Sequence, residues 1–483
     1  MALERRVKIV ATLGPAVAGK DKLVDLISAG ADMVRINAAH GSEETRVRLI
    51  EDVRAASDAF GKPVPILFDL RGLKIRTGPL PDGSGPVPFA RGSDVRIVPM
   101  PESTREGLIG INLPQLLQVI KPGSRILIAD GLIELLVERV DSESALCKVG
   151  RGGILHSKQG VTLPGAAIVG GSLTPDDRID IAFAVSHGVD YLGLSFINDA
   201  SDLVLAKGVA GAHGHAVPAL IAKIERPEAL NNVGEIATQA DGLMVARGDL
   251  GVQLPPERVP RAQKHIIQTC NTLGVPVITA TQMLESMITQ PMATRAETSD
   301  VANAVWDGTD AVMLSAESAV GQYPIESVQT MARIIAEAER EGPIRTSASS
   351  QPLPTHGDSS LALADAIAQA AMALADTAPV EHILVFTLTG SAAKRLAKYR
   401  PKPPMIAITS EEATARRLAL VWGLRSVVVP VEEDPDTMFR VAGQAVIDAG
   451  LGRADEYVLI VGSLPMMRVA GRTNLLHVRR LGT

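Results

Sequence analysis

Short apolar runs alternate with amphipathic, helix-like segments along most of the chain, and this alternation predicts parallel strands joined by helices. The first three predicted strands are Lys8–Leu13, Met33–Ala38 and Pro65–Leu70. After a long interruption, five more are predicted at Tyr191–Phe196, Leu220–Glu225, Gly242–Arg247, Val275–Ala280 and Ala311–Ser315. Three plus five strands make the eight of a closed (β/α)8 TIM barrel, which is the expected α/β fold class.

The interruption has a different pattern, with no strong amphipathic helix except the segment LPQLLQVI. It opens with the turn-rich stretch GPLPDGSGPVP and continues with strand-like segments such as RILIADGLIELLVERV. An all-β module between a barrel strand and its helix is typical of a lid, because barrel loops tolerate insertions and line the site. The helical rhythm resumes at Thr174, a predicted N-cap followed by proline.

A linker is predicted from Arg340, where the segment REGPIRTSASSQPLPTHGDSS is rich in Ser, Pro and Gly. Beyond it, segments from HILVFTL to LLHVRRL predict a second α/β unit. The predicted domains are a barrel domain of residues 1–76 and 172–342, an inserted β-barrel lid of residues 77–171, and a C-terminal α/β domain of residues 343–483.

Composition narrows the function classes. Hydrophobic residues make up 46% of the chain but aromatic residues only 3%, which suits buried parallel strands and their covering helices. The net charge of −6 argues against a nucleic-acid partner, so an anion site needs a local cluster of Arg and Lys. Cys147 and Cys270 give no disulfide framework, and neither a signal peptide nor a long apolar run is evident. We therefore expect a cytoplasmic protein without membrane spans.

Polar residues end seven of the predicted barrel strands. These are Arg35, Asn37 and His40 on the second, Asp69, Arg71, Lys74 and Arg76 on the third, Ser195 on the fourth, Lys223 and Glu225 on the fifth, Arg247 and Asp249 on the sixth, Thr281 on the seventh, and Ser315 and Glu317 on the eighth. The ends of parallel barrel strands converge on one face, where barrel enzymes have their active sites. One such residue alone could be an ion pair or a helix cap, but seven strands together predict one site.

The segment AKIERP carries the most specific chemistry. Lys223 and Glu225 are two residues apart on a strand, so they point to the same side. Asp249 follows by one helix and one strand, and two carboxylates with free positions for water suit Mg²⁺ or Mn²⁺. The competing interpretation is a plain Lys–Glu–Asp ion-pair cluster. Arg35, Arg76 and Arg247 supply positive charge for a phosphate; for Arg71 we expect ordinary surface solvation.

Two further patterns do not support a site. The segment GPAVAGKD nearly matches a P-loop, but it ends in Asp21 where the metal-binding hydroxyl is required, and that carboxylate repels phosphate. His213 and His215 could bind a metal, but a solvated loop is the better interpretation.

Nine segments taken in order resemble the pyruvate kinase family. They are KIVATLGPA, MVRINAAHG, ILFDLRGLKIRTG, GVTLPG, IAKIERPEAL, MVARGDLGV, TATQMLESM, TRAETSDVANAVWDGTDAVMLSAES and GRTNLLHVRR. The resemblance implies a magnesium-dependent transferase of glycolysis. Such an enzyme moves the phosphoryl group of phosphoenolpyruvate to ADP, giving pyruvate and ATP, and is commonly an allosteric homotetramer.

The resemblance also assigns roles to single residues. Glu225 and Asp249 resemble the metal ligands, and Lys223, Arg35 and Thr281 the catalytic residues. The remaining assignments are substrate binding for Ala246, Arg247, Gly248, Asp249, Thr281 and Ser195, and nucleotide binding for Asn37, His40, Arg76, Lys158 and Asp130.

The sequence departs from the family at its K⁺ site. Family members that require K⁺ carry Glu where this chain has Lys74, and Ser where it has Ala39. We hypothesise that the Lys74 ammonium replaces K⁺ beside Asn37 and Asp69, so that K⁺ is not required. The competing interpretation is that Lys74 pairs with a nearby acid.

The C-terminal unit carries one weak candidate for an effector site. Thr389, Gly390 and Ser391 form a loop that could bind a sugar phosphate or AMP, but an ordinary N-cap explains these residues as well.

Two competing functions fit the same barrel-end residues. A Mg²⁺-dependent lyase or aldolase would share a metal site such as Glu225 and Asp249, and a non-catalytic sensor would only bind phosphoenolpyruvate or ADP. The inserted β module and the C-terminal unit count against the lyase, and the presence of Lys223, Glu225, Asp249 and Thr281 counts against the sensor.

Overall fold

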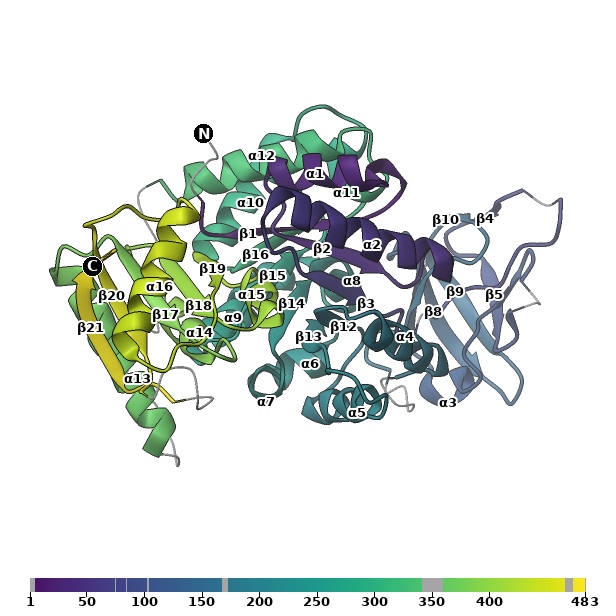
Figure 1. Ribbon diagram of the computed structural model, residues 1–483. Coiled ribbons are helices and arrows are strands. Elements are labelled where there is room, and N and C mark those ends of the chain that lie inside the picture. Colours follow the sequence, from purple (N-terminus) through teal and green to yellow (C-terminus); the bar gives the residue numbers. More distant parts are fainter. Residues whose placement is uncertain are drawn as a thin grey trace.

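Three parts of the chain lie in a row in the computed structural model (Figure 1). A β/α barrel occupies the middle, a small all-β part lies on one side, and an α/β part lies on the other. The structure describes residues 5–73, 75–83, 85–101, 104–166, 173–340, 359–464 and 472–482. The predicted fold class is therefore confirmed, whereas the domain boundaries stay predictions.

The barrel closes through parallel pairing in the order β1-β16-β15-β14-β13-β12-β3-β2. Its strands are β1 (Lys8–Thr12), β2 (Met33–Asn37), β3 (Ile66–Asp69), β12 (Tyr191–Leu194), β13 (Ala219–Ile224), β14 (Gly242–Ala246), β15 (Val277–Ala280) and β16 (Ala311–Leu314). All eight were predicted. Most end one or two residues earlier than predicted.

Helices surround the barrel and bury their apolar faces against it. They are α1 (Lys20–Ala29), α2 (Glu43–Phe60), α4 (Pro175–Ser186), α5 (Ala200–Gly211), α6 (Pro227–Asn231), α7 (Val233–Gln239), α8 (Arg247–Gln253), α9 (Val259–Leu273), α10 (Arg295–Asp307), α11 (Ala316–Ala319) and α12 (Pro324–Ala338). The start of α4 agrees with its prediction. Thr174 caps it, and the Thr174 backbone N–H in turn donates to the Asp177 side chain, which forms a capping box.

The inserted part consists of strands, as predicted. They are β4 (Val87–Phe89), β5 (Asp94–Val98), β6 (Leu108–Gly110), β7 (Arg125–Ile128), β8 (Ile133–Val140), β9 (Ala145–Arg151), β10 (Gly153–Leu155) and β11 (Val161–Thr162), with one short helix, α3 (Leu116–Val119). Six of these strands form one sheet in the order β11-β7-β8-β9-β5-β6, and β10 pairs with β4. A separate apolar core fills this part, so it packs as a unit of its own.

The C-terminal part is a five-stranded sheet in the order β19-β18-β17-β20-β21, of which only β21 runs antiparallel. The elements are α13 (Ser359–Thr377), β17 (His382–Phe386), α14 (Ser391–Ala397), β18 (Met405–Thr409), α15 (Glu412–Leu418), β19 (Leu424–Val428), α16 (Pro435–Asp448), β20 (Tyr457–Gly462) and β21 (Leu475–Arg480). The predicted linker lies largely outside the described residues.

The C-terminal part closes the N-terminal end of the barrel. Leu420 is buried among side chains from inside the barrel, including Met33 and Tyr191. The Tyr191 hydroxyl donates a 2.7 Å hydrogen bond to the Arg417 carbonyl. A residue from the last third of the chain therefore completes the inner layers that fill the barrel.

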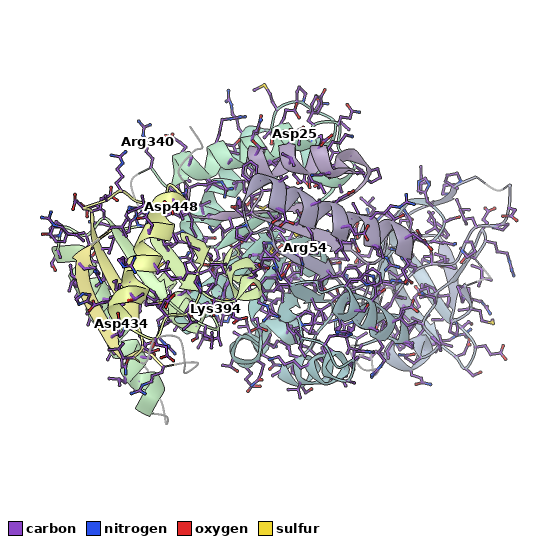
Figure 2. All side chains as sticks on the ribbon, viewed as in Figure 1. Asp25, Arg54, Arg340, Lys394, Asp434 and Asp448 are labelled. Atoms are coloured by element: carbon purple, nitrogen blue, oxygen red, sulfur yellow. The ribbon has the colours of Figure 1, made fainter. Side chains whose placement is uncertain are left out.

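A buried carboxylate joins the same two parts. Asp190 lies just before β12 and pairs with Arg416 of α15 at 2.8 Å and with Arg54 of α2 at 2.9 Å. Arg54 is labelled in Figure 2 and lies on the barrel surface away from the inserted β part. Each arginine neutralises part of the buried charge, so removing one of them leaves the other in place.

A cavity of about 410 Å³ lies beside this junction, lined in part by Arg5, Lys8, Asp32, Lys62 and Arg425. The Lys8 ammonium donates a 2.7 Å hydrogen bond to the Leu424 carbonyl, across the junction. Burial lowers the pKa of Lys8 to about 8, although Asp32 opposes that shift. Lys8 is the first residue of β1, so it lies at the end of the barrel opposite the predicted site.

Among the described residues, none of the helices combines the length and the apolar character that a membrane-spanning helix needs.

Candidate active site

Four charged residues at the ends of β2, β3 and β13 form a buried network where the carboxyl ends of the barrel strands meet. The Lys223 ammonium lies 2.9 Å from Glu225 and 3.2 Å from Asp69. Asp69 also pairs with the Arg35 guanidinium at 2.6 Å. The strand positions predicted that Lys223 and Glu225 share one side, and the 2.9 Å contact agrees with this placement.

Burial and ion pairing shift the pKa values of these residues in opposite directions. Burial raises the pKa of Glu225 to about 7, although Lys223 opposes that shift. Burial favours the neutral amine of Lys223, but the Asp69 and Glu225 carboxylates outweigh it and raise the pKa of that ammonium. The pKa of Asp69 is lowered, because Lys223 and Arg35 together exceed the effect of burial. Lys223 is thus a permanent positive charge, whereas Glu225 exchanges a proton near neutral pH.

Hydrogen bonds fix the network to the backbone. The Ser195 hydroxyl donates to the Leu70 carbonyl at 3.0 Å and accepts from Lys223 at 2.7 Å. Glu225 accepts a 2.7 Å hydrogen bond from the Phe196 N–H. These contacts hold the ammonium and one carboxylate oxygen in place without a substrate, which is the preorganisation that charge stabilisation needs.

A second wall of the site comes from the ends of β14 and β15. Thr281 has a φ of +69°, and its hydroxyl donates to the Ala280 carbonyl at 2.6 Å. The same hydroxyl accepts a 2.7 Å hydrogen bond from the Gly248 N–H, in the first turn of α8. The structure therefore brings together Thr281 and the segment Ala246–Asp249, two of the predicted substrate-binding elements.

The Arg247 side chain points elsewhere. Its guanidinium donates to the carbonyls of Thr281 and Gln282, at 2.6 and 3.0 Å, and pairs with Asp300 at 2.7 Å. These partners occupy the guanidinium and fix the loop that carries Thr281. The geometry is compatible with substrate binding by the Arg247 backbone. It does not support the prediction that the Arg247 side chain binds a phosphate.

The two predicted metal ligands follow neighbouring strands and differ in exposure. Glu225 is buried, whereas Asp249 is exposed, yet its charge is near enough to raise the pKa of Glu225 further. Glu225 Oε1 has only the ion pair with Lys223 and accepts no hydrogen bond from the residues that the structure describes. In the described part of the chain no three His, Cys, Asp or Glu side chains gather as a metal cluster. Two carboxylates fit a divalent ion that keeps water and substrate ligands.

The predicted nucleotide-binding residues fall into two groups. Asn37 ends β2, and its side-chain oxygen accepts the Ala39 N–H at 3.0 Å, in the turn that leads to exposed His40. Arg76 and Lys158 lie together at the base of the inserted part, where the Arg76 guanidinium donates to the Lys158 carbonyl at 2.9 Å. Asp130 is exposed in the turn between β7 and β8.

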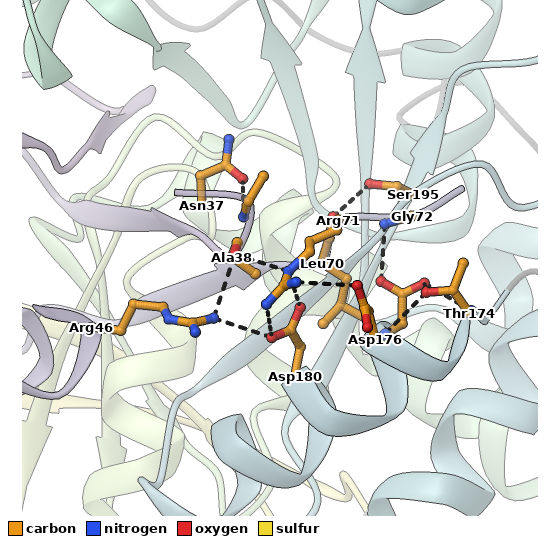
Figure 3. Close-up of polar contacts among 12 residues, drawn as sticks. Asn37, Ala38, Arg46, Leu70, Arg71, Gly72, Thr174, Asp176, Asp180 and Ser195 are labelled. Atoms are coloured by element: carbon orange, nitrogen blue, oxygen red, sulfur yellow. Dashed lines mark hydrogen bonds and ion pairs between the residues drawn. The ribbon is translucent and has the colours of Figure 1, made fainter. Parts of the chain in front are cut away.

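Arg71 differs from its prediction. Instead of being solvated, its guanidinium pairs with Asp180 of α4 at 2.9 Å and with Asp176 at 3.3 Å, and donates to the Ala38 carbonyl at 3.1 Å (Figure 3). The expectation of a free surface arginine was wrong because both carboxylates come from α4, which follows the inserted part in the sequence.

Thr12 was missed by the sequence analysis. It ends β1, accepts a 3.2 Å hydrogen bond from Arg35, and donates to the Leu314 carbonyl at 2.8 Å. Its place as the last residue of the segment KIVAT is the only signal that the sequence offers. Glu317, in contrast, binds the backbone N–H groups of Ser315 and Leu284 and has a structural role.

The cation substitute and the effector loop are the two remaining predicted sites. Lys74 lies outside the described residues, so its contacts stay a prediction. In the candidate effector loop, the Thr389 hydroxyl donates to Ser391 at 3.3 Å, and Gly390 precedes α14 with no side-chain cap.

Comparisons with known proteins show the family of the chain. Residues 4–328 match the family model described as "Pyruvate kinase, barrel domain", and residues 365–479 match "Pyruvate kinase, alpha/beta domain". A pyruvate kinase of Geobacillus stearothermophilus is 42% identical over 480 residues, which cover 99% of this chain and 80% of the relative. One from Agrobacterium vitis is 41% identical, with 99% of each chain covered.

The comparison with solved structures also points to the pyruvate kinase family. The crystal structure of a pyruvate kinase from Cryptosporidium parvum superposes with a TM-score of 0.90 at 32% sequence identity, covering 99% of this chain and 96% of the other. The chain is therefore an enzyme that belongs to the pyruvate kinase family.

Proposed function

We propose that the enzyme transfers the phosphoryl group of phosphoenolpyruvate to ADP and releases pyruvate and ATP, as the last step of glycolysis. The observation that carries the proposal is the buried network of Lys223, Glu225, Asp69 and Arg35 at the barrel rim. Phosphoryl transfer depends on positioning and on neutralising negative charge more than on covalent help. Lys223 and Arg35 supply fixed positive charge in a site sheltered from water.

The remaining roles follow from the second wall of the site. The backbone of Ala246–Asp249 would receive the substrate carboxylate at the start of α8, with Ser195 holding Lys223 in place. After transfer, the enolate needs a proton, and the Thr281 hydroxyl is held beside that segment by Gly248. We assign Asn37, His40, Arg76, Lys158 and Asp130 to the nucleotide.

Glu225 and Asp249 would hold Mg²⁺ or Mn²⁺. The ion, when bound, supplies a Lewis-acid charge for the oxygens of the substrate and of the transferred group. The test of the whole proposal is pyruvate formation from phosphoenolpyruvate, ADP and MgCl₂, followed through coupled NADH oxidation. A protein that binds phosphoenolpyruvate but forms no pyruvate would point to the lyase or the sensor instead.

K⁺ independence is a separate proposal. In tetramethylammonium buffer we expect full activity within about twofold of that in KCl, because the Lys74 ammonium replaces the cation. Lys74→Glu is expected to lose activity in the K⁺-free buffer and to regain part of it with KCl. Strong K⁺ activation of the unaltered enzyme would contradict the role of Lys74 and leave the kinase reaction intact.

Regulation is proposed for the loop of Thr389, Gly390 and Ser391. If a sugar phosphate or AMP binds there, its addition lowers the phosphoenolpyruvate concentration at half-maximal rate, and Ser391→Ala weakens that effect. Titration with sugar mono- and bisphosphates and with AMP measures it. No response to any of these compounds would leave the loop as an ordinary helix start.

We also propose a homotetramer in the cytoplasm. Met292, just before α10, and Trp306, near the end of α10, have exposed fractions of 77% and 50%, and a second copy could cover these side chains. Sedimentation of the purified protein measures the oligomeric state.

A further inference from the structure

A compact polar cluster ties the inserted β part to the barrel, and none of the proposed catalytic roles uses it. We call it the crossing clamp, and it consists of Arg46, Arg71, Thr174, Asp176, Asp177 and Asp180. Figure 3 shows these contacts between the end of β3 and the start of α4. They lie where the chain leaves the barrel for the inserted part and where it returns.

One carboxylate joins the two crossings directly. Asp177 accepts a 2.9 Å hydrogen bond from the Gly72 N–H on the outgoing side. It also accepts hydrogen bonds from the Thr174 N–H and hydroxyl on the returning side, at 2.9 and 2.7 Å. Asp177 is only 1% exposed, so these bonds are sheltered from water and fix both segments to the same point.

Gly72 allows the outgoing chain to lie against that point. Its φ is +64°, and an added Cβ would lie 2.7 Å from Ser195 Cβ and 2.8 Å from the Phe196 ring. The outgoing chain therefore runs close against the two residues that hold Lys223 and Glu225.

Arg71 extends the clamp to the nucleotide side of the rim. Its guanidinium pairs with Asp180 at 2.9 Å and donates to the Ala38 carbonyl at 3.1 Å. Arg46 of α2 binds Asp180 from the other side at 3.1 Å and donates a longer hydrogen bond of 3.4 Å to the same Ala38 carbonyl. Ala38 lies between Asn37 and the turn to His40, so one guanidinium connects the outgoing crossing, α4 and the turn that carries two predicted nucleotide contacts.

We infer that Arg71, anchored by Asp180, is a positioning residue for the nucleotide. It holds the Asn37–His40 turn and the outgoing crossing, which leads to Arg76, in one fixed arrangement. The inference rests on the proposed nucleotide role of Asn37, His40 and Arg76. Lys223, Thr281 and the Ala246–Asp249 segment, proposed to bind phosphoenolpyruvate, lie at the ends of β13, β14 and β15. Ser195 follows β12 and lies against Gly72, but among the described residues the clamp side chains form no hydrogen bond or ion pair with it.

Replacing Arg71 is expected to affect the KM for ADP much more than the KM for phosphoenolpyruvate. Arg71→Met is expected to raise the KM for ADP at least tenfold while the KM for phosphoenolpyruvate changes less than about twofold. Arg71→Lys keeps a charge beside Asp180 and is expected to recover part of the ADP affinity. If Arg71→Met does not fold, Asp180→Asn keeps the side-chain shape, weakens the same ion pair and is expected to give the same split between the two KM values.

Arg54→Met is the matched control. Arg54 and Arg71 each serve as one of two arginines on a buried aspartate, but Arg54 pairs with Asp190 at the opposite end of the barrel. It is expected to leave both KM values unchanged even if the melting temperature falls.

The outcomes distinguish the positioning role from the proposed function. If the unaltered enzyme makes no pyruvate from phosphoenolpyruvate and ADP, the proposed function itself is wrong. An active enzyme whose Arg71→Met variant only melts earlier, or loses both substrates equally, overturns the positioning role and leaves the kinase reaction standing.

Discussion

Replacing Lys223 by methionine is expected to lower kcat by about 1,000-fold, which corresponds to roughly 4 kcal/mol of transition-state stabilisation. The reason is the position of its ammonium, 2.9 Å from Glu225 and 3.2 Å from Asp69 in a buried network. Methionine keeps most of the side-chain volume but removes the charge that we propose meets the phosphoryl group in transit. Steady-state kinetics at saturating phosphoenolpyruvate, ADP and Mg²⁺ measures the loss.

Two buried carboxylates lose a partner in this variant, so part of any loss could come from instability. Lys8→Met is the matched control, because Lys8 is also buried on a barrel strand but lies at the opposite end. We expect Lys8→Met to keep nearly full kcat. If Lys223→Met also keeps it within tenfold, the ammonium is not the catalytic charge.

Glu225→Gln is expected to weaken Mg²⁺ binding about 100-fold or more, and kcat/KM with it, because an amide removes one of the two proposed anionic ligands. Direct Mn²⁺ binding, followed by electron paramagnetic resonance, measures the affinity without relying on activity. Glu317→Gln is the control, since that buried carboxylate accepts hydrogen bonds from the backbone N–H groups of Ser315 and Leu284. An unchanged Mn²⁺ affinity in Glu225→Gln would place the metal elsewhere.

The same carboxylate predicts a pH dependence of metal binding. Burial raises the pKa of Glu225 to about 7, so below that pH a proton competes with the metal for the carboxylate. The apparent Mn²⁺ dissociation constant should rise about tenfold per pH unit below pH 7 and level off above it. Glu225→Gln has no such proton and should lose this dependence.

The sequence predicted those parts of the site that depend on strand order alone. Lys223 and Glu225 belong to one short segment, and alternation along a strand was enough to place them together. The eight barrel strands followed from apolar runs for the same reason. Which partners each polar residue would choose could not be predicted from such local patterns.

Arg71 and Arg247 illustrate the limit. Asp180 lies 109 residues after Arg71, beyond the whole inserted part, and Asp300 reaches Arg247 from the helix after the next strand. A charged side chain near a strand end can turn into the site or away from it, and the distant partner decides which. Only the packed structure supplies that partner.

The placement of Leu420 has a consequence for how the protein is made. This residue completes the interior of the barrel from the C-terminal part, and the Arg417 carbonyl beside it binds Tyr191. A ribosome delivers all eight barrel strands well before it delivers Leu420. The nascent barrel therefore emerges with one end of its apolar interior uncovered, and it reaches its final packing only after synthesis is nearly finished.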